Sequence, residues 1–290
     1  MDYAEQTLWS DPGPLRERLT ELPVAPRDLA DALENFLIHH VAARFLKFGV
    51  PEEAEPDRNL RTVEKLLTAA FARDARPLSQ QRELSAYLYG SCHDFALLAA
   101  SVFRFNGIAA RLRVGFVDYF RQGRWEDHWL CEYRTDGAWH LLDAQMGRRA
   151  REGHGIGFAV ESVPRQRFRS GSQLWLDLRA GRVDPDTCGV SFAGISGDWF
   201  PAASVLRDAA TLAMIEPLPW DYWGPARNFC LTQAVTDDAA RDLDALAQTF
   251  EQPPETPEAA RASLADFPWA IPGETVLSAV GGRLQERPLR

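Results

Sequence analysis

Apolar residues recur every three or four positions through much of the first hundred residues, which is the spacing of an amphipathic helix. In RDLADALENFLIHHVAARFLKFG, residues 27–49, one face collects Leu29, Leu33, Phe36, Leu37 and His40. RNLRTVEKLLTAAFARD, residues 58–74, repeats the pattern with Leu60, Val63, Leu66 and Leu67. We therefore expect two helices, then a link that contains Pro77, and then further helix candidates up to residue 105.

The pattern changes at Asn106-Gly107, which predicts the end of a helix followed by a turn. ARLRVGFVDYF, residues 110–120, alternates between apolar and polar positions, as a half-buried strand does. Two more strands are expected in WEDHWLCEYR, residues 125–134, and in AWHLLDAQ, residues 138–145. Residues 82–145 are thus predicted to form a helix followed by an antiparallel sheet.

After residue 150 the pattern is mixed but mainly helical. Helices are predicted in RSGSQLWLDLRAGR (169–182), WFPAASVLRDAATLAMI (199–215) and TDDAARDLDALAQTFE (236–251). The stretch EPLPWDYWGPA, residues 216–226, reads as a proline- and tryptophan-rich loop that packs on another part of the chain. We find no linker, so we expect a core over residues 1–150 and an extension over residues 151–290 that packs on it.

Composition narrows the functional classes. The chain has 290 residues and a net charge of −9, whereas nucleic-acid binders and proteins of anionic membranes are usually basic. The start, MDYAEQTLWSDPGPLRERL, does not resemble a secretion signal, and no apolar run approaches the length of a membrane span. We therefore expect a cytoplasmic protein with reduced thiols. The cysteines and histidines lack the spacing of a zinc site, and no metal is expected.

The most informative cysteine is Cys92, in YLYGSCHDFALLAASVFRFNG. Ser91 is a good helix N-cap, and Asp94 stands three residues later, as in a capping box. Cys92 is then the first helical residue, where unpaired N–H groups and the helix dipole stabilise a thiolate. The same N–H groups can stabilise an oxyanion. This position suits a nucleophile.

A cysteine nucleophile needs a base and a group that orients the base. His128 and Asp143 lie on the two strands of the predicted hairpin. If Thr135-Asp136 forms the turn, the two are direct cross-strand partners. If Asp136-Gly137 forms it, His128 opposes Gln145 and lies diagonal to Asp143 on the same face. A three-residue turn separates them onto opposite faces. The sequence does not choose between these registers.

Other residues of this region have simpler readings. Cys131 alternates onto the strand face opposite His128 and is expected to pack. His39 and His40 are expected to be one buried and one exposed helix histidine. Asp118, Glu132 and Asp136 are expected on the surface.

The segments GSCHDFALLAASVFRFNGIAARLRVGF, DHWLCEY and WHLLDAQ, in this order, resemble the transglutaminase-like superfamily. LIHHVAARF, RDAATL and LPWDYWG further resemble a group of bacterial transglutaminase-like proteins. The resemblance implies an α+β, papain-like fold, with N-terminal helices packed on an antiparallel sheet and a mainly helical C-terminal extension.

The resemblance also implies a function. Cys92 would be the nucleophile, His128 the base and Asp143 the residue that orients the base, in acyl transfer or hydrolysis at an amide or thioester without a cofactor. The expected partners are a peptide, amide or acyl-thioester substrate and, for some acceptors, an amine; nucleic acid and membrane are not expected. The alternative is a non-catalytic binding or scaffold protein, although such proteins often lose the cysteine or the histidine.

Overall fold

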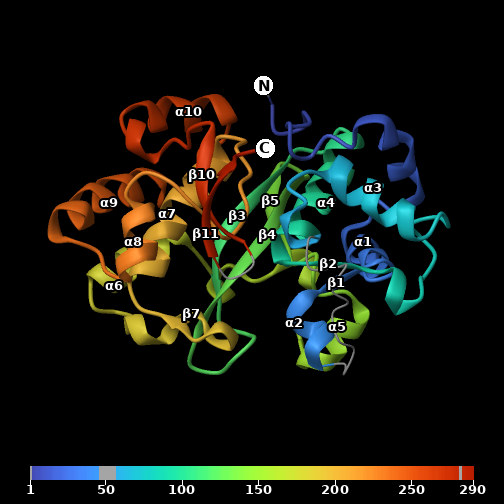
Figure 1. Cartoon of the computed structure of the whole chain (residues 1–290), viewed down its shortest axis with the longest axis horizontal. Helices are drawn as coiled ribbons and strands as arrows, with labels where there is room; N and C mark the ends of the chain where they lie inside the picture. The colour runs from blue at the N-terminus through green and yellow to red at the C-terminus, as the bar shows by residue number, and fades with distance from the viewer. Residues whose placement is uncertain (1, 46–56, 281–282) are drawn as a thin grey trace. The chain divides into compact units, whose positions relative to one another are not determined.

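The computed structural model describes residues 2–45, 57–280 and 283–290, and it is α+β (Figure 1). The α-helices are α1 (Pro26–Leu33), α2 (His40–Phe45), α3 (Val63–Arg73), α4 (Cys92–Phe105), α5 (Arg148–His154), α6 (Gly171–Arg179), α7 (Trp199–Leu212), α8 (Ala226–Thr232), α9 (Asp237–Phe250) and α10 (Pro257–Ala265). The strands are β1 (Leu37–His39), β2 (Leu88–Gly90), β3 (Ala110–Val117), β4 (Trp125–Thr135), β5 (Ala138–Leu142), β6 (Phe168–Ser170), β7 (Cys188–Val190), β8 (Ile195–Ser196), β9 (Asp221–Tyr222), β10 (Thr275–Val280) and β11 (Arg283–Pro288).

The chain divides into two compact units. The N-terminal unit contains Tyr3–Arg111 and Leu130–Val163, and the C-terminal unit contains Asp2, Leu112–Trp129 and Pro164–Arg290. Strands β3 and β4 contribute residues to both units. The boundary that the sequence suggested at residue 150 lies inside α5, and it stays a prediction.

The long helix predicted over residues 27–49 is wrong in its middle. Helix α1 ends at Leu33, and Leu37–His39 form β1, which pairs in parallel with β2 (Leu88–Gly90). A parallel partner fifty residues away supplies the backbone hydrogen bonds that a continuing helix would have made. Helix α2 then starts at His40, and residues 46–49 of the predicted helix lie outside the described residues. Short strand β2 likewise stands among the helix candidates that precede α4.

The other helices of the N-terminal unit follow the prediction. Helix α3 begins after Thr62, whose hydroxyl accepts a hydrogen bond from the Lys65 N–H at 3.3 Å. Helix α4 runs from Cys92 to Phe105 and ends at Asn106-Gly107, where Gly107 has φ +71°. Both helices bury most of their apolar residues, and α1 and α3 each pack on α4.

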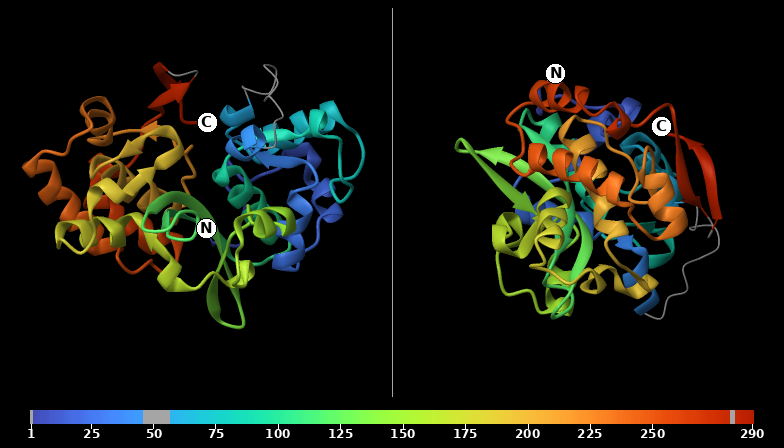
Figure 2. Two further views of the ribbon diagram at one scale, coloured as in Figure 1. Left: turned by 90° about the horizontal axis from the view of Figure 1, so that it is seen from below. Right: turned by 90° about the vertical axis from the view of Figure 1, so that its left-hand side faces the viewer.

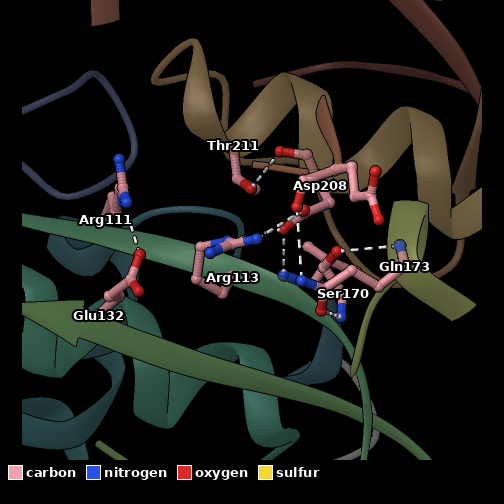
Figure 3. Close-up of polar contacts among 9 residues, drawn as sticks. Arg111, Arg113, Glu132, Ser170, Gln173, Asp208 and Thr211 are labelled. Atoms are coloured by element: carbon pink, nitrogen blue, oxygen red, sulfur yellow. Dashed lines mark hydrogen bonds and ion pairs between the residues drawn. The ribbon is translucent and has the colours of Figure 1, made fainter. Parts of the chain in front are cut away.

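Strand β3 is buried along its whole length, including two arginines. Its apolar residues alternate as predicted, and the arginines occupy the positions between them. Arg111 Nε donates to Glu132 Oε2 at 2.7 Å in the N-terminal unit (Figure 3). The Arg111 guanidinium also lies 4.0 Å from the centre of the Trp139 ring. Glu132, expected on the surface, is thus fully buried, because it is the counter-charge of a buried arginine.

The turn between β4 and β5 consists of Asp136 and Gly137. Both have positive φ, 51° and 78°, which is the conformation of a type I′ hairpin turn. The ladder runs from Thr135 opposite Ala138 to Cys131 opposite Leu142. Of the three registers that the sequence left open, the structure has the one in which Asp136-Gly137 is the turn.

The sheet is larger than the one predicted from residues 109–145. Its strand order is β6-β3-β4-β7-β8, with β5 paired to β4. Strands β3, β4 and β5 were predicted, whereas β6, β7 and β8 come from the region after residue 150. Strand β7 pairs with β4 in parallel, so the sheet is mixed rather than wholly antiparallel.

The C-terminal unit is mainly helical, as predicted. Its helices, coloured yellow to red, gather around α7, which contacts α6, α8, α9 and α10 (Figures 1 and 2). The Trp175 indole N–H of α6 donates to Asp244 of α9 at 2.8 Å. The proline- and tryptophan-rich segment contains β9, and its Trp223 N–H donates to the Ala270 carbonyl at 2.8 Å. A β9–β10–β11 sheet, which the sequence did not predict, also belongs to this unit.

Candidate functional site

Cys92 begins α4, as the sequence predicted. Ser91 is extended, with φ −125°, and its N–H donates to the Asp94 carboxylate at 2.7 Å. The Ser91 hydroxyl also donates to the same carboxylate at 3.2 Å. The Cys92 side chain is 6% exposed. The thiol therefore stands in the first turn of a helix, where the partial positive charge of the dipole favours a thiolate.

Two buried residues follow Cys92 in the same turn. His93 and Asp94 are both fully buried, and His93 Nδ1 lies 3.2 Å from Asp94 Oδ1. Because a carboxylate only accepts hydrogen bonds, this geometry places a proton on His93 Nδ1. One carboxylate thus contacts both the Ser91 N–H before the helix and the imidazole of the residue that follows Cys92.

His128 lies on β4 in the C-terminal unit and is buried. Two aromatic rings from the segment between β3 and β4 meet the imidazole edge to face. The ring centre of Phe120 is 4.8 Å away, and that of Tyr119 is 6.3 Å away. Both rings belong to the strand predicted over residues 110–120, but β3 ends at Val117, and the alternating pattern did not predict their contact with His128. They limit the orientations that the imidazole can adopt.

Asp143 follows directly after β5 in the N-terminal unit and is fully buried. Its N–H donates to the Val160 carbonyl at 2.9 Å, and its carbonyl accepts from the Met146 N–H at 3.1 Å. Its carboxylate accepts the Gln145 N–H at 3.2 Å. The turn around Asp143 therefore holds this carboxylate in a fixed place. The paired part of the hairpin ends at Leu142, one residue before Asp143.

The structure therefore assigns each predicted residue an ordered, buried place. Cys92 and Asp143 belong to the N-terminal unit, and His128 belongs to the C-terminal unit. Strand β4 leaves the C-terminal unit after Trp129, the residue that follows His128. A direct approach of the three to one another is part of the proposal below.

The four cysteines, all in the described part of the chain, carry thiols rather than disulfides. Burial raises the pKa of Cys188 to about 11, and it also raises the pKa of Cys230. Cys131 is fully buried on β4 opposite Leu142, as its predicted packing role requires. At neutral pH, Cys188 and Cys230 are thus held as poorly nucleophilic thiols.

An acidic group adjoins His128 in the chain. Burial raises the pKa of the Asp127 carboxyl to about 6, against the opposing effect of the Arg207 and His128 charges. This carboxyl accordingly changes its charge within the pH range in which a histidine base operates.

An open cavity of about 650 Å³ lies in the C-terminal unit, a volume typical of sites for small ligands. The segment between β3 and β4 forms one part of its lining, and the segment between α6 and β7 forms another. Its polar lining includes Arg124, Arg167 and Arg182. Tyr119 belongs both to this lining and to the aromatic contacts of His128.

The described residues hold no group of three or more histidine, cysteine or acidic side chains that could bind a metal ion. Within residues 2–45, 57–280 and 283–290, no helix has the length and apolar character that a membrane crossing requires.

Comparison with known proteins gives one match. Residues 15–144 match the model of the transglutaminase-like superfamily, and this range contains the three candidate site residues. Neither the curated proteins nor the solved structures include a match to the chain.

Proposed function

We propose that residues 15–144, which match the transglutaminase-like superfamily, form a cysteine enzyme that transfers or hydrolyses acyl groups. The observation that carries the proposal is the place of Cys92, the first residue of α4, directly behind a capped helix start. The N-terminus of a helix lowers the pKa of a thiol, and the resulting thiolate is the reactive form. A cysteine that only packs in the core does not need this position.

In the proposed reaction, His128 takes the proton of the Cys92 thiol. The sulfur attacks the carbonyl carbon of an amide or thioester, and the carbonyl oxygen becomes an oxyanion that the Cys92 N–H stabilises. The oxyanion collapses and the bond to the amine or thiol breaks. His128 returns its proton to that leaving group, and an acyl-enzyme remains. Water or an amine then attacks the acyl-enzyme, loses its proton to His128 and releases the sulfur.

Asp143 has the role of orienting His128. A buried carboxylate that accepts from one imidazole nitrogen fixes the tautomer, so that the other nitrogen can take a proton from sulfur. The fixed turn around Asp143 supports this role, and so does the hairpin register, which would put Asp143 on the face of His128 if the pairing continued past Leu142.

The substrate class proposed is a peptide, amide or acyl thioester, with water or an amine as acceptor. The polar cavity beside Tyr119 would accept a hydrophilic arm of such a substrate. The steps above require no metal ion or cofactor.

A small activated acyl donor tests the proposal without knowledge of the natural substrate. Incubation with p-nitrophenyl acetate, acid quenching and mass spectrometry should show one acetyl group on the peptide that contains Cys92. Cys92→Ala and His128→Ala should abolish this modification, and Cys230→Ser, which removes a half-buried thiol elsewhere, should retain it. Acetylation that is independent of both Cys92 and His128 would instead favour a non-catalytic binding protein.

A further inference from the structure

The parallel pairing of β1 with β2 brings a histidine pair to the start of α4. His39 pairs with Gly90, the last residue before Ser91 and Cys92. His40, 7% exposed, places its Nδ1 3.1 Å from the Gly90 carbonyl oxygen. The rings of His39 and His40 are stacked, with their centres 4.6 Å apart. All of these residues belong to the N-terminal unit.

The hydrogen-bond partners fix which nitrogen of each ring carries a proton. A carbonyl oxygen only accepts, so His40 Nδ1 is the donor to Gly90. The Val41 N–H donates to His39 Nδ1 at 3.2 Å, so that nitrogen is an acceptor and the His39 ring is neutral. The two stacked rings therefore differ in role: His40 donates to the segment before Cys92, and His39 accepts from the backbone of Val41.

The peptide group between Gly90 and Ser91 is held at both of its polar ends. Its carbonyl accepts from His40, and its N–H donates to Asp94. Asp94 is held in turn by His93. Because this peptide lies one residue before Cys92, its orientation determines where the thiol and the first N–H groups of α4 point.

Close packing leaves the peptide little freedom. A Cβ atom on Gly90 would lie 2.7 Å from Asp94 Oδ2 and 2.9 Å from Leu37 Cδ1. Real Cβ atoms do not approach so closely, so only glycine fits between the β1 strand and the capping carboxylate. The site is thus built around one particular placement of the Gly90–Ser91 peptide.

We propose that His40 is a positioning residue for Cys92: its Nδ1–H and the Asp94 carboxylate together clamp the Gly90–Ser91 peptide and set the reactivity of the thiol. The inference rests on the proposed function, in which Cys92 is the nucleophile. A clamped peptide keeps the helix N–H groups directed at the sulfur and at the oxyanion, and a loosened one lets them turn away.

Three substitutions of His40 separate the hydrogen bond from the bulk of the ring. Asparagine places its amide N–H₂ near the position of Nδ1, glutamine places it near Nε2, and leucine has no donor. The measurement is the rate of Cys92 alkylation by iodoacetamide between pH 5 and 9, followed by mass spectrometry of the Cys92 peptide. Thermal unfolding checks that each variant is folded.

We expect His40→Leu and His40→Gln to raise the apparent pKa of the thiol by about one unit, which lowers the rate at pH 6 about tenfold. His40→Asn should stay within about threefold of the parent rate. Equal losses in all three folded variants would show that ring volume matters rather than the Nδ1 donor. An unchanged profile in folded His40→Leu would also overturn the inference.

Amide hydrogen exchange at Ser91 keeps this test separate from the proposed function. A loosened clamp speeds exchange at Ser91 in His40→Leu and His40→Gln but not in His40→Asn, whatever Cys92 does. If the parent Cys92 reacts as an ordinary exposed thiol, the proposed function fails. If the parent Cys92 is highly reactive and Ser91 exchange is the same in all variants, the clamp alone fails.

Discussion

Arg113 of β3 and Asp208 of α7 form a buried, two-point ion pair in the C-terminal unit. Arg113 Nε donates to Asp208 Oδ1 at 3.1 Å, and Nη2 donates to Oδ2 at 3.0 Å (Figure 3). Asp208 Oδ1 also accepts the Val114 N–H at 2.9 Å. The carboxylate of one helix thus satisfies both a buried side-chain charge and a backbone donor of the sheet.

Breaking this pair from one side should be costly. Asp208→Leu leaves the Arg113 charge and the Val114 N–H buried without their acceptor, and we expect it to lower the free energy of unfolding by about 3–5 kcal/mol. The double variant Arg113→Met/Asp208→Leu should recover part of that loss, because it removes the buried charge. Urea unfolding of the single and double variants measures the difference. Additive losses would show that the two side chains act independently.

The same pair predicts the result of truncation. A fragment of residues 1–150 keeps Arg113 but lacks Asp208, and it also loses β6, which pairs with β3. The strand would expose a buried arginine and an unpaired edge. We expect the fragment to be insoluble or unfolded. Cooperative unfolding of a soluble 1–150 fragment, with the Cys92 reactivity of the full chain, would show that the extension is dispensable.

Asp127 predicts a pH dependence of stability. Its pKa in the folded protein, about 6, lies above the value of about 4 in an unfolded chain, so the folded state binds this proton more tightly. The resulting stability is complete below pH 4 and is lost as the pH rises through 6. A shift of two pKa units changes the free energy of unfolding by about 3 kcal/mol. This is an upper limit, because the Asp127 side chain is only half-buried.

Asp127→Asn removes this titration. Relative to the parent, the variant should be equally stable at pH 4 and more stable at pH 7, as measured by urea unfolding at both pH values. Asp136→Asn, an exposed control on the β4–β5 turn, should show no such difference. A parent and an Asp127→Asn variant with parallel pH profiles would contradict the raised pKa.

Much of the fold follows from the periodicity of single segments. Helices α3, α4, α6, α7 and α9 and strands β3, β4 and β5 were all predicted from the spacing of apolar residues, and so was the start of α4 at Cys92. The capping residues Ser91 and Asp94 lie within one turn of that start. Local patterns suffice where the partners are neighbours in the chain.

The predictions are wrong where local structure or burial depends on a segment that is distant in the chain. Strand β1 forms because β2 pairs with it, and the apolar pattern of residues 27–49 does not predict that pairing. Glu132 is buried because Arg111 lies on the neighbouring strand, whereas a lone glutamate in a strand suggests a solvated edge. The aromatic contacts of His128 likewise depend on how the β3–β4 segment folds back on β4.

The hairpin is an intermediate case. Asp-Gly is a strong signal for a two-residue type I′ turn, and the structure has Asp136-Gly137 in that turn. The sequence could not exclude the neighbouring pair Thr135-Asp136, because the apolar pattern of the two strands tolerates both. The positive φ of Asp136 and Gly137 selects the register of the ladder that ends at Leu142.

The order in which the four thiols react tests the nucleophile directly. Cys92 stands at the start of a helix, whereas burial raises the pKa of Cys188 to about 11 and that of Cys230 as well. Only thiolates react at an appreciable rate, so at pH 6–7 iodoacetamide should label Cys92 first, by at least about tenfold over Cys188. Cys131 is fully buried and should be labelled only on unfolding.

Peptide mapping of the alkylated protein after short exposures measures this order. In the proposed site His128 takes the proton of the Cys92 thiol, so His128→Ala should slow the labelling of Cys92 near neutral pH while labelling of Cys230 stays the same. Denaturation in urea should bring all four thiols to similar rates, which checks that the difference comes from the fold. Preferential labelling of Cys131, Cys188 or Cys230 in the folded protein would remove Cys92 from the role of nucleophile.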